Sequence, residues 1–299
     1  MITVFEQVLL LFIFAVAGYV LSRTGLVKTE HSGMLSKLLV YLFLPCNVIR
    51  TFNENFTIPY ISANIDVIFV AIILLIATIA VTEVIVRLID KEKYRQAIWR
   101  YSLIIPNLGY MGWPLVGALY GDEMMLMSMI FCLPMQIYIY TYGYAVLTKS
   151  GLNLKSLINP TVISLVAGIV LGLTGIKLPG IVLSAMDKGS ACMAPVSMIL
   201  AGIVISEYNP KELIGDARVW IVTAFRLVIF PVAVGLAIRP FVSETALILS
   251  VVMTALPCGL NTIVFPKLVG EDCKPGAALG LISNVLSCAT IPVCLTLLL

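Results

Sequence analysis

The chain alternates long apolar stretches with short polar ones. Runs of about twenty mainly apolar residues recur along its 299 residues and are separated by short charged segments. About twenty helical residues are enough to cross the hydrocarbon core of a bilayer. The pattern therefore predicts an all-α membrane protein with ten transmembrane helices. Their expected ranges are 2–22, 33–52, 66–88, 98–119, 123–147, 158–176, 183–206, 217–239, 245–268 and 276–298.

The two halves of the chain resemble each other. The pattern Ala17-Gly18-x-Val20-Leu21-x-x-Thr24-Gly25 recurs 150 residues later as Ala167-Gly168-x-Val170-Leu171-x-x-Thr174-Gly175, and the same offset relates Pro45 to Pro195. We predict two five-helix repeats, residues 1–150 and 151–299. Because five is odd, the second repeat must enter the membrane from the opposite side. This inverted-repeat plan is common among secondary transporters.

Basic residues gather in alternate loops. If the N-terminus is outside, the inside loops and their flanks hold fourteen lysines and arginines, whereas the outside holds four. The inside set is Arg23, Lys28, Lys37, Arg87, Lys91, Lys93, Arg95, Arg100, Lys149, Lys155, Lys211, Arg218, Lys267 and Lys274, and the outside set is Arg50, Lys177, Lys188 and Arg239. The bias predicts a multi-pass protein of the cell (inner) membrane with both termini extracytoplasmic.

Composition narrows the possible classes. The chain is 60% hydrophobic and 12% charged, and its net charge of +3 is scattered over loops, so no nucleic-acid partner is expected. The first apolar run has neither a basic n-region nor an A-x-A-like site, which indicates a retained helix and not a signal peptide. Seven cysteines form no CxxC pair; small buried thiols explain them better than a metal site or disulfides, and no cofactor is predicted.

Enzyme motifs are missing from the sequence. The lone histidine, His31, has no HExxH context, and neither GxSxG nor a Walker A motif occurs. We therefore do not expect an enzyme. A membrane receptor or a channel is another alternative, but neither would need the feature described next.

The fourth and ninth apolar ranges contain residues that interrupt helices. Asn107 to Gly121 reads NLGYMGWPLVGALYG, with four glycines and a proline, and Leu256 to Pro266 reads LPCGLNTIVFP. Matched interruptions in two halves point to a transporter binding site, because non-helical backbone at membrane depth must be buried in protein or line a wet cavity. Each half-helix after a break would offer a positive N-terminus to a carboxylate. Packing kinks are the alternative.

We expect the substrate to contact polar and helix-breaking residues of both breaks. These are Asn107, Gly109, Gly112, Pro114, Pro257, Gly259, Asn261 and Thr262. Polar residues of the fifth and tenth ranges would complete the site or form interhelical hydrogen bonds; they are Gln136, Tyr138, Tyr140, Ser283, Asn284 and Ser287. Arg226, deep in the eighth range, would attract a carboxylate or tie down a helix end.

Two motifs carry a family resemblance. The N-x-G-x-M-G-x-P of residues 107–114, the L-P-x-G-x-N of residues 256–261 and the ten-span repeat resemble the auxin efflux carrier family, in its prokaryotic branch. That family is similar to the plant PIN auxin exporters and more distantly to bile-acid sodium symporters. Plant members have a second proline near Asn261 and Thr262, which this chain lacks, so the resemblance leaves the break point in the ninth span open.

The resemblance implies a mechanism. Spans four and nine would cross at their breaks beside the substrate, spans 1, 2, 6 and 7 would form a scaffold, and spans 3–5 and 8–10 would move against it as a transport unit. Two copies would dimerise through the scaffold.

We therefore expect a secondary carrier in the lipid bilayer for a small organic anion, a mono- or dicarboxylate, working by elevator-type alternating access. Proton or sodium coupling and the direction of transport are left open. The alternatives are a sodium-coupled symporter of the bile-acid type and a receptor that transports nothing.

Overall fold

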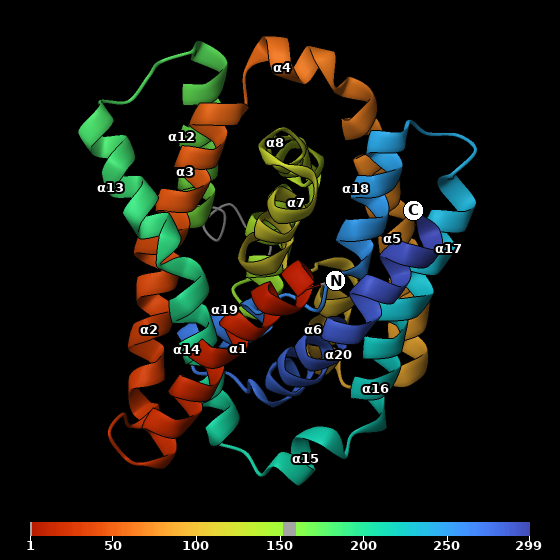
Figure 1. Ribbon diagram of the computed structural model, residues 1–299. Helices are drawn as coiled ribbons and strands as arrows, with labels where there is room; N and C mark the ends of the chain where they lie inside the picture. Colours follow the sequence, from red (N-terminus) through yellow and green to blue (C-terminus); the bar gives the residue numbers. More distant parts are fainter. Residues whose placement is uncertain (1, 152–159) are drawn as a thin grey trace.

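The computed structural model describes residues 2–151 and 160–299 of the chain, which fold into helices (Figure 1). The first half contains α1 (Ile2–Arg23), η1 (Thr29–His31), α2 (Ser32–Leu38), η2 (Leu39–Phe43), α3 (Leu44–Asn55), α4 (Ile58–Ala63), α5 (Ile65–Ile89), α6 (Lys93–Ile104), η3 (Leu108–Gly112), α7 (Trp113–Tyr120), α8 (Asp122–Phe131), α9 (Leu133–Tyr138), η4 (Ile139–Gly143) and α10 (Tyr144–Leu147). The second half contains α12 (Pro160–Thr174), α13 (Gly180–Ala191), α14 (Met193–Ser206), α15 (Pro210–Ile214), α16 (Ala217–Ala224), η5 (Phe225–Ile229), α17 (Phe230–Ile238), α18 (Glu244–Ala255), α19 (Asn261–Leu268) and α20 (Lys274–Leu298). The predicted sixth span begins at 158, so its first residues and Lys155 lie outside the described part.

Several helices are long and apolar enough to cross a membrane. Among the described residues, five are continuous, and a sixth is formed if Glu123–Phe131 and Leu133–Leu147, bent by 45°, count as one span. The five are Thr29–Asn53, Ile65–Ile89, Gly180–Ser206, Ala217–Ile238 and Lys274–Leu298. The prediction of an all-helical, multi-pass membrane protein is confirmed in this form. The finer arrangement of ten spans in two inverted repeats is a proposal taken up below.

Two helix ends 150 residues apart are built alike. The Thr24 hydroxyl donates to backbone carbonyls three and four residues earlier, at 3.2 and 2.9 Å. The Thr174 hydroxyl does the same, at 3.3 and 2.7 Å. Gly25 and Gly175 follow with φ of 76° and 70°, the left-handed conformation that commonly ends a helix. The repeated Thr-Gly pair thus gives the same local structure twice.

Small residues let two helix pairs pack closely. A Cβ on Gly18 of α1 would lie 2.2 Å from the Ile199 carbonyl oxygen of α14, and one on Gly168 of α12 would lie 2.9 Å from the Phe52 Cβ of α3. Close backbone approach at small residues is a typical way for membrane helices to associate. The α1–α14 and α3–α12 pairs therefore depend on these glycines.

The interrupted helices lie in the interior. In Figure 1, α6, α7 and α19 lie between the group of α2, α3, α12 and α13 on one side and the group of α16, α17 and α18 on the other. The polar connections at the lower end of this view are held together by two sets of charged residues.

The first charged set surrounds Asp90, just after α5. Its buried carboxylate accepts hydrogen bonds from Arg95 (2.8 and 3.0 Å), from the Trp99 indole (2.9 Å) and from Arg218 (2.9 Å). Burial alone would raise the pKa of Asp90, but the bonds from Arg95 and Trp99 and the charge of Arg218 hold it far below its ordinary value. Because Arg218 belongs to α16, this cluster ties the two halves of the chain together.

The second charged set joins the α14–α15 segment to the turn between α19 and α20. Lys267 pairs with Glu207 at 2.7 Å, and Lys274 pairs with Glu212 at 2.6 Å. The Tyr208 hydroxyl donates to Asp272 at 3.2 Å. We call these three contacts the α15 latch.

Candidate functional site

Both predicted ranges are interrupted, the ninth inside the stretch Leu256–Pro266 and the fourth at the very start of the stretch Asn107–Gly121, so Gly109, Gly112 and Pro114 lie in the helical segments after the break and not in it. Helix α6 ends at Ile104, residues 105–107 are non-helical, and the chain becomes helical again in η3 and α7. Helix α18 ends at Ala255, and α19 begins at Asn261 after a break at residues 256–260. The structure thus fixes the break point of the ninth range, with Pro257 inside the break and Pro266 inside α19.

The two breaks pair with each other. Pro106 and Cys258 form an antiparallel bridge. The backbone N–H of Asn107 donates to the Pro257 carbonyl at 2.8 Å, and the backbone N–H of Gly259 donates to the Ile105 carbonyl at 3.2 Å. Each break therefore satisfies backbone groups that the other has freed, which is a requirement for non-helical backbone inside a membrane protein.

Glycine makes this close approach possible. A Cβ on Gly259 would lie 3.1 Å from the Pro106 carbonyl oxygen and 3.3 Å from that of Ile105. On Gly112 it would lie 2.6 Å from Leu256 Cδ1. A larger residue at Gly259 would press on the backbone of the facing break, whereas the close neighbour of Gly112 is the end of the Leu256 side chain, which can move.

Helix α20 supports the breaks from one side. The Ser283 hydroxyl accepts a hydrogen bond from the Cys258 amide at 3.1 Å. The Asn107 side-chain amide lies 3.5 Å from the Asn284 side-chain oxygen, at the limit of a hydrogen bond. Ser287 donates to the carbonyl of Asn284 within its own helix. For Ser283 and Asn284, the interhelical role proposed as one alternative is the one observed.

Arg226 binds the helix ends that precede the breaks. It lies in η5, is 1% exposed, and donates to the carbonyls of Leu256 (3.0 Å), Leu103 (3.1 Å) and Met253 (2.8 Å). These carbonyls belong to the ends of α6 and α18, where helices leave such groups unpaired. Of the two roles considered for Arg226, tying down helix ends is the one its contacts show.

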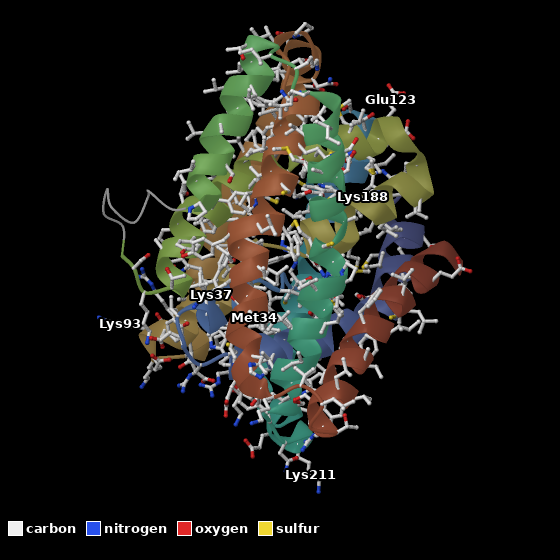
Figure 2. The ribbon with its side chains drawn as sticks, turned by 90° about the vertical axis from the view of Figure 1, so that its left-hand side faces the viewer. Met34, Lys37, Lys93, Glu123, Lys188 and Lys211 are labelled. Carbon is white, nitrogen blue, oxygen red and sulfur yellow. The ribbon has the colours of Figure 1, made fainter. Side chains whose placement is uncertain are left out.

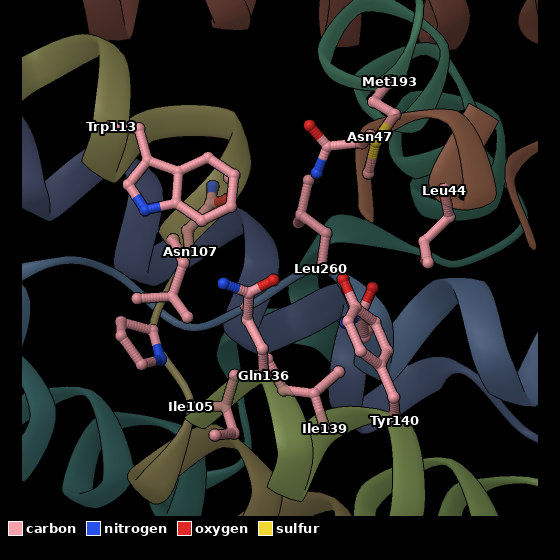
Figure 3. Close-up of a pocket in the computed structure, with 15 residues that line it drawn as sticks. Leu44, Asn47, Ile105, Asn107, Trp113, Gln136, Ile139, Tyr140, Met193 and Leu260 are labelled. Carbon is pink, nitrogen blue, oxygen red and sulfur yellow. The ribbon is translucent and has the colours of Figure 1, made fainter. Parts of the chain in front are cut away.

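A small cavity lies beside the paired breaks (Figure 3). Its volume is about 40 Å³, room for about three water molecules. Six of the predicted site residues line it: Asn107, Gly109, Gln136, Tyr140, Gly259 and Asn261. Gly112, Pro257, Thr262, Asn284, Ser287 and Arg226 are not part of this lining, and the side chain of Pro114 lies outside the described part of the structure. Ser283 is also outside it, and Thr262 donates to the carbonyl of Gly259.

Polar atoms around the cavity lack partners. Gln136 is 1% exposed, and neither its amide oxygen nor its amide nitrogen has a hydrogen-bond partner among the described residues. The same is true of the side-chain oxygens of Asn107 and Asn261. Figure 3 shows the Gln136 amide reaching toward the side where Trp113 and Asn47 lie. Since an unpaired buried polar group costs about 1–3 kcal/mol, these groups are available for a polar guest.

Sequence reasoning missed three residues at or beside the cavity. Trp113 lines the cavity and lies within the 107–114 motif. Asn47 lines the cavity from α3, with its side-chain oxygen accepting from Ser190 at 2.8 Å. Tyr101 of α6 accepts a hydrogen bond from the Asn261 side chain at 2.8 Å. Of the three, only Trp113 could have been found from the sequence, because it lies within a motif. Asn47 and Tyr101 are brought to the cavity by the packing of the helices.

A second, mostly apolar cavity of about 200 Å³ lies next to the first. Leu260 lines both cavities, and the second is otherwise formed by residues of α1, α14 and α20. Among the described residues, no group of histidine, cysteine or acidic side chains could hold a metal ion. The chemistry available at the breaks is therefore that of amides, an indole, a phenol and helix ends.

Two interrupted helices that meet beside a polar cavity inside a helical membrane protein are typical of transporters. Comparison with known proteins agrees. The chain belongs to the membrane transport protein family, which matches residues 3–154 and 146–295, and the resemblance to auxin efflux carriers is thereby confirmed. It is also 23% identical over 286 residues, 90% of each chain, to an uncharacterised transporter of Methanocaldococcus jannaschii. Membership of a transporter family is consistent with the expectation that the chain is not an enzyme.

Proposed function

We propose that the protein is a secondary carrier for a small organic anion, a mono- or dicarboxylate, that works by alternating access. The substrate's carboxylate would sit in the cavity beside the paired breaks, between Gln136, Asn107 and Asn261. One observation carries this proposal: the cavity is lined by buried polar groups without partners, at the start of two half-helices.

Several features support two inverted repeats. Gly18 packs against Ile199, and Gly168 packs close to Ile49. The repeat offset of 150 relates position 18 to 168 and position 49 to 199. The contact of Gly18 with Ile199 is therefore the equivalent of the contact of Gly168 with Ile49, with the two halves exchanged. The two Thr-Gly helix ends follow the same offset. A chain of two equivalent halves, with a broken helix at the matching position of each, fits a carrier that opens to either side in turn.

The placement of charges supports the proposed topology. In Figure 2, Lys93 and Lys211 lie toward the lower end of the molecule and Glu123 toward the upper end. The lower end would then face the cytoplasm, and both termini would be extracytoplasmic in the cell membrane. In an elevator mechanism, α5–α10 and α16–α20 would move against α1–α3 and α12–α14, and two copies would pair through the latter group.

A sodium-coupled symporter is the second candidate. The unpartnered side-chain oxygens of Asn107, Asn261 and Gln136 are the neutral oxygen ligands that a small hard cation accepts. No carboxylate of a described residue lines the cavity. The negative charge that balances a coupled cation would therefore have to come from the substrate's carboxylate.

Counterflow in proteoliposomes tests the proposal. Vesicles loaded with unlabelled acetate, malonate, succinate or malate should take up the same labelled acid faster than empty vesicles, with sodium present or absent. A sodium requirement would favour the symporter, and a receptor would move nothing. Asn107→Ala and Asn261→Ala should each abolish exchange, whereas Asn209→Ala, at the start of α15, should not. Full exchange in both cavity variants would contradict the proposed site.

A further inference from the structure

Four helix ends meet at the paired breaks. Helices α6 and α18 arrive with their C-termini, and η3 with α7 and α19 depart with their N-termini. A helix carries about +0.5 charge at its N-terminus and about −0.5 at its C-terminus. The four ends together would cancel, and the paired breaks alone would have little preference for an anion.

Arg226 removes this cancellation. Its three hydrogen bonds go to Leu103, Met253 and Leu256, at the two negative ends. Among the described residues, Arg226 forms no salt bridge with a carboxylate. Its full positive charge offsets the two C-termini, so the positive N-termini are left uncompensated.

The positive ends face the cavity, whereas the negative ends contribute to its described lining through Ile105, whose carbonyl is already bonded to the Gly259 amide. Leu108 and Gly109 of η3 and Leu260 and Asn261 at the start of α19 all line it. The three residues bound by Arg226 do not line it, and neither does Arg226. The unpartnered amide of Gln136 marks this space independently as one that receives a polar guest.

We propose that Arg226 is a positioning residue that makes the site selective for anions without touching the substrate. It does so by neutralising the C-termini of α6 and α18, which gives the paired breaks a net charge of about +1. This inference rests on the proposed function, since it explains why the guest of the cavity is an anion.

Thr223 offers a way to cancel the charge while keeping the arginine. It lies three residues before Arg226 in the sequence, is 2% exposed, and its hydroxyl has no partner among the described residues. Side chains three apart on a helix are neighbours. In Thr223→Asp, a carboxylate would pair with Arg226 and remove the net charge.

The test compares carboxylates with their neutral amides. Thermal-shift titrations of the purified protein with acetate, malonate and succinate, and with acetamide, malonamide and succinamide, give a ratio of affinities for each pair. Wild type should prefer at least one carboxylate at least tenfold. Arg226→Gln and Thr223→Asp should reduce that ratio about tenfold by weakening carboxylate binding alone, and Arg226→Lys should keep it.

Each outcome is decisive. An unchanged ratio in a folded Arg226→Gln or Thr223→Asp protein would overturn this inference but leave the proposed function intact. If wild type binds none of the carboxylates, both the proposed function and this inference fail. If Arg226→Gln does not fold, Thr223→Asp, which keeps the bonds to the helix ends, decides the question together with Arg226→Lys.

Discussion

Replacing Gln136 by methionine should make the protein more stable and inactive. Gln136 is buried at 1% exposure, with neither end of its amide paired among the described residues. A group adapted for folding would be paired, whereas one that binds a guest remains unpaired until the guest arrives. Methionine is about as long as glutamine but has no amide to leave unpaired. The substitution should therefore lower stability if Gln136 serves folding, and raise stability while weakening binding if Gln136 serves the guest.

The size of the gain follows from the cavity. Two unpaired buried polar groups would cost about 1–3 kcal/mol each if the site were dry. A cavity of about 40 Å³ admits about three waters, which recover most of that cost. We therefore expect Gln136→Met to gain about 1 kcal/mol, or roughly 2–4 °C in Tm, measured by thermal unfolding in detergent. Carboxylate binding should weaken at least tenfold in the same protein.

Gln96→Met is the matched control. The Gln96 side chain donates to the Asp90 carbonyl at 2.6 Å, so this substitution removes a bond that is made. It should lower stability by about 1 kcal/mol and leave binding unchanged. If Gln136→Met lowers Tm as Gln96→Met does, or keeps carboxylate binding, Gln136 is a structural residue and the assignment of the cavity is wrong.

Three further substitutions test other parts of the account. Asp90→Asn should destabilise the protein by about 3 kcal/mol; since the pKa of Asp90 is lowered on folding, its contribution is present above about pH 4 and is lost as the pH falls through the folded pKa. If lowering the pH reduces the Tm of the wild type no more than it reduces the Tm of Asp90→Asn, the stabilising role of the Asp90 carboxylate is contradicted. Gly259→Val should reduce exchange at least tenfold because its side chain would meet the Pro106 carbonyl oxygen; wild-type exchange would show that the breaks can separate. Lys267→Ala removes a partly buried ion pair of the α15 latch that joins the end of α14, in the proposed scaffold, to α19, in the proposed moving unit. It should cost about 1 kcal/mol and change the exchange rate severalfold, and an unchanged rate would show that this pair does not act in the transport cycle.

The sequence predicts the helices and their interruptions well because both are local properties. Apolar runs set the helix ranges, and residues that interrupt helices lie in both breaks, Pro106 in the first and Pro257 and Gly259 in the second. The Thr-Gly pairs at Thr24 and Thr174 likewise act through carbonyls of their own turn. Each of these features is decided within a few residues.

Contacts between distant segments could not be predicted in the same way. Nothing near Arg226 in the sequence indicates that its partners are Leu103 and Met253, because those carbonyls become available only where α6 and α18 end side by side. Asn47 faces the cavity because α3 packs near the breaks. The register of the two breaks, with Asn107 bound to Pro257, also depends on the packed fold.

A crystal structure of the protein with the carboxylate that gives the fastest counterflow would test the central claim most directly. The account predicts carboxylate density in the cavity between η3 and the start of α19, within hydrogen-bond distance of the Gln136 amide. Density elsewhere with an empty cavity, or two continuous helices in place of the paired breaks, would contradict it.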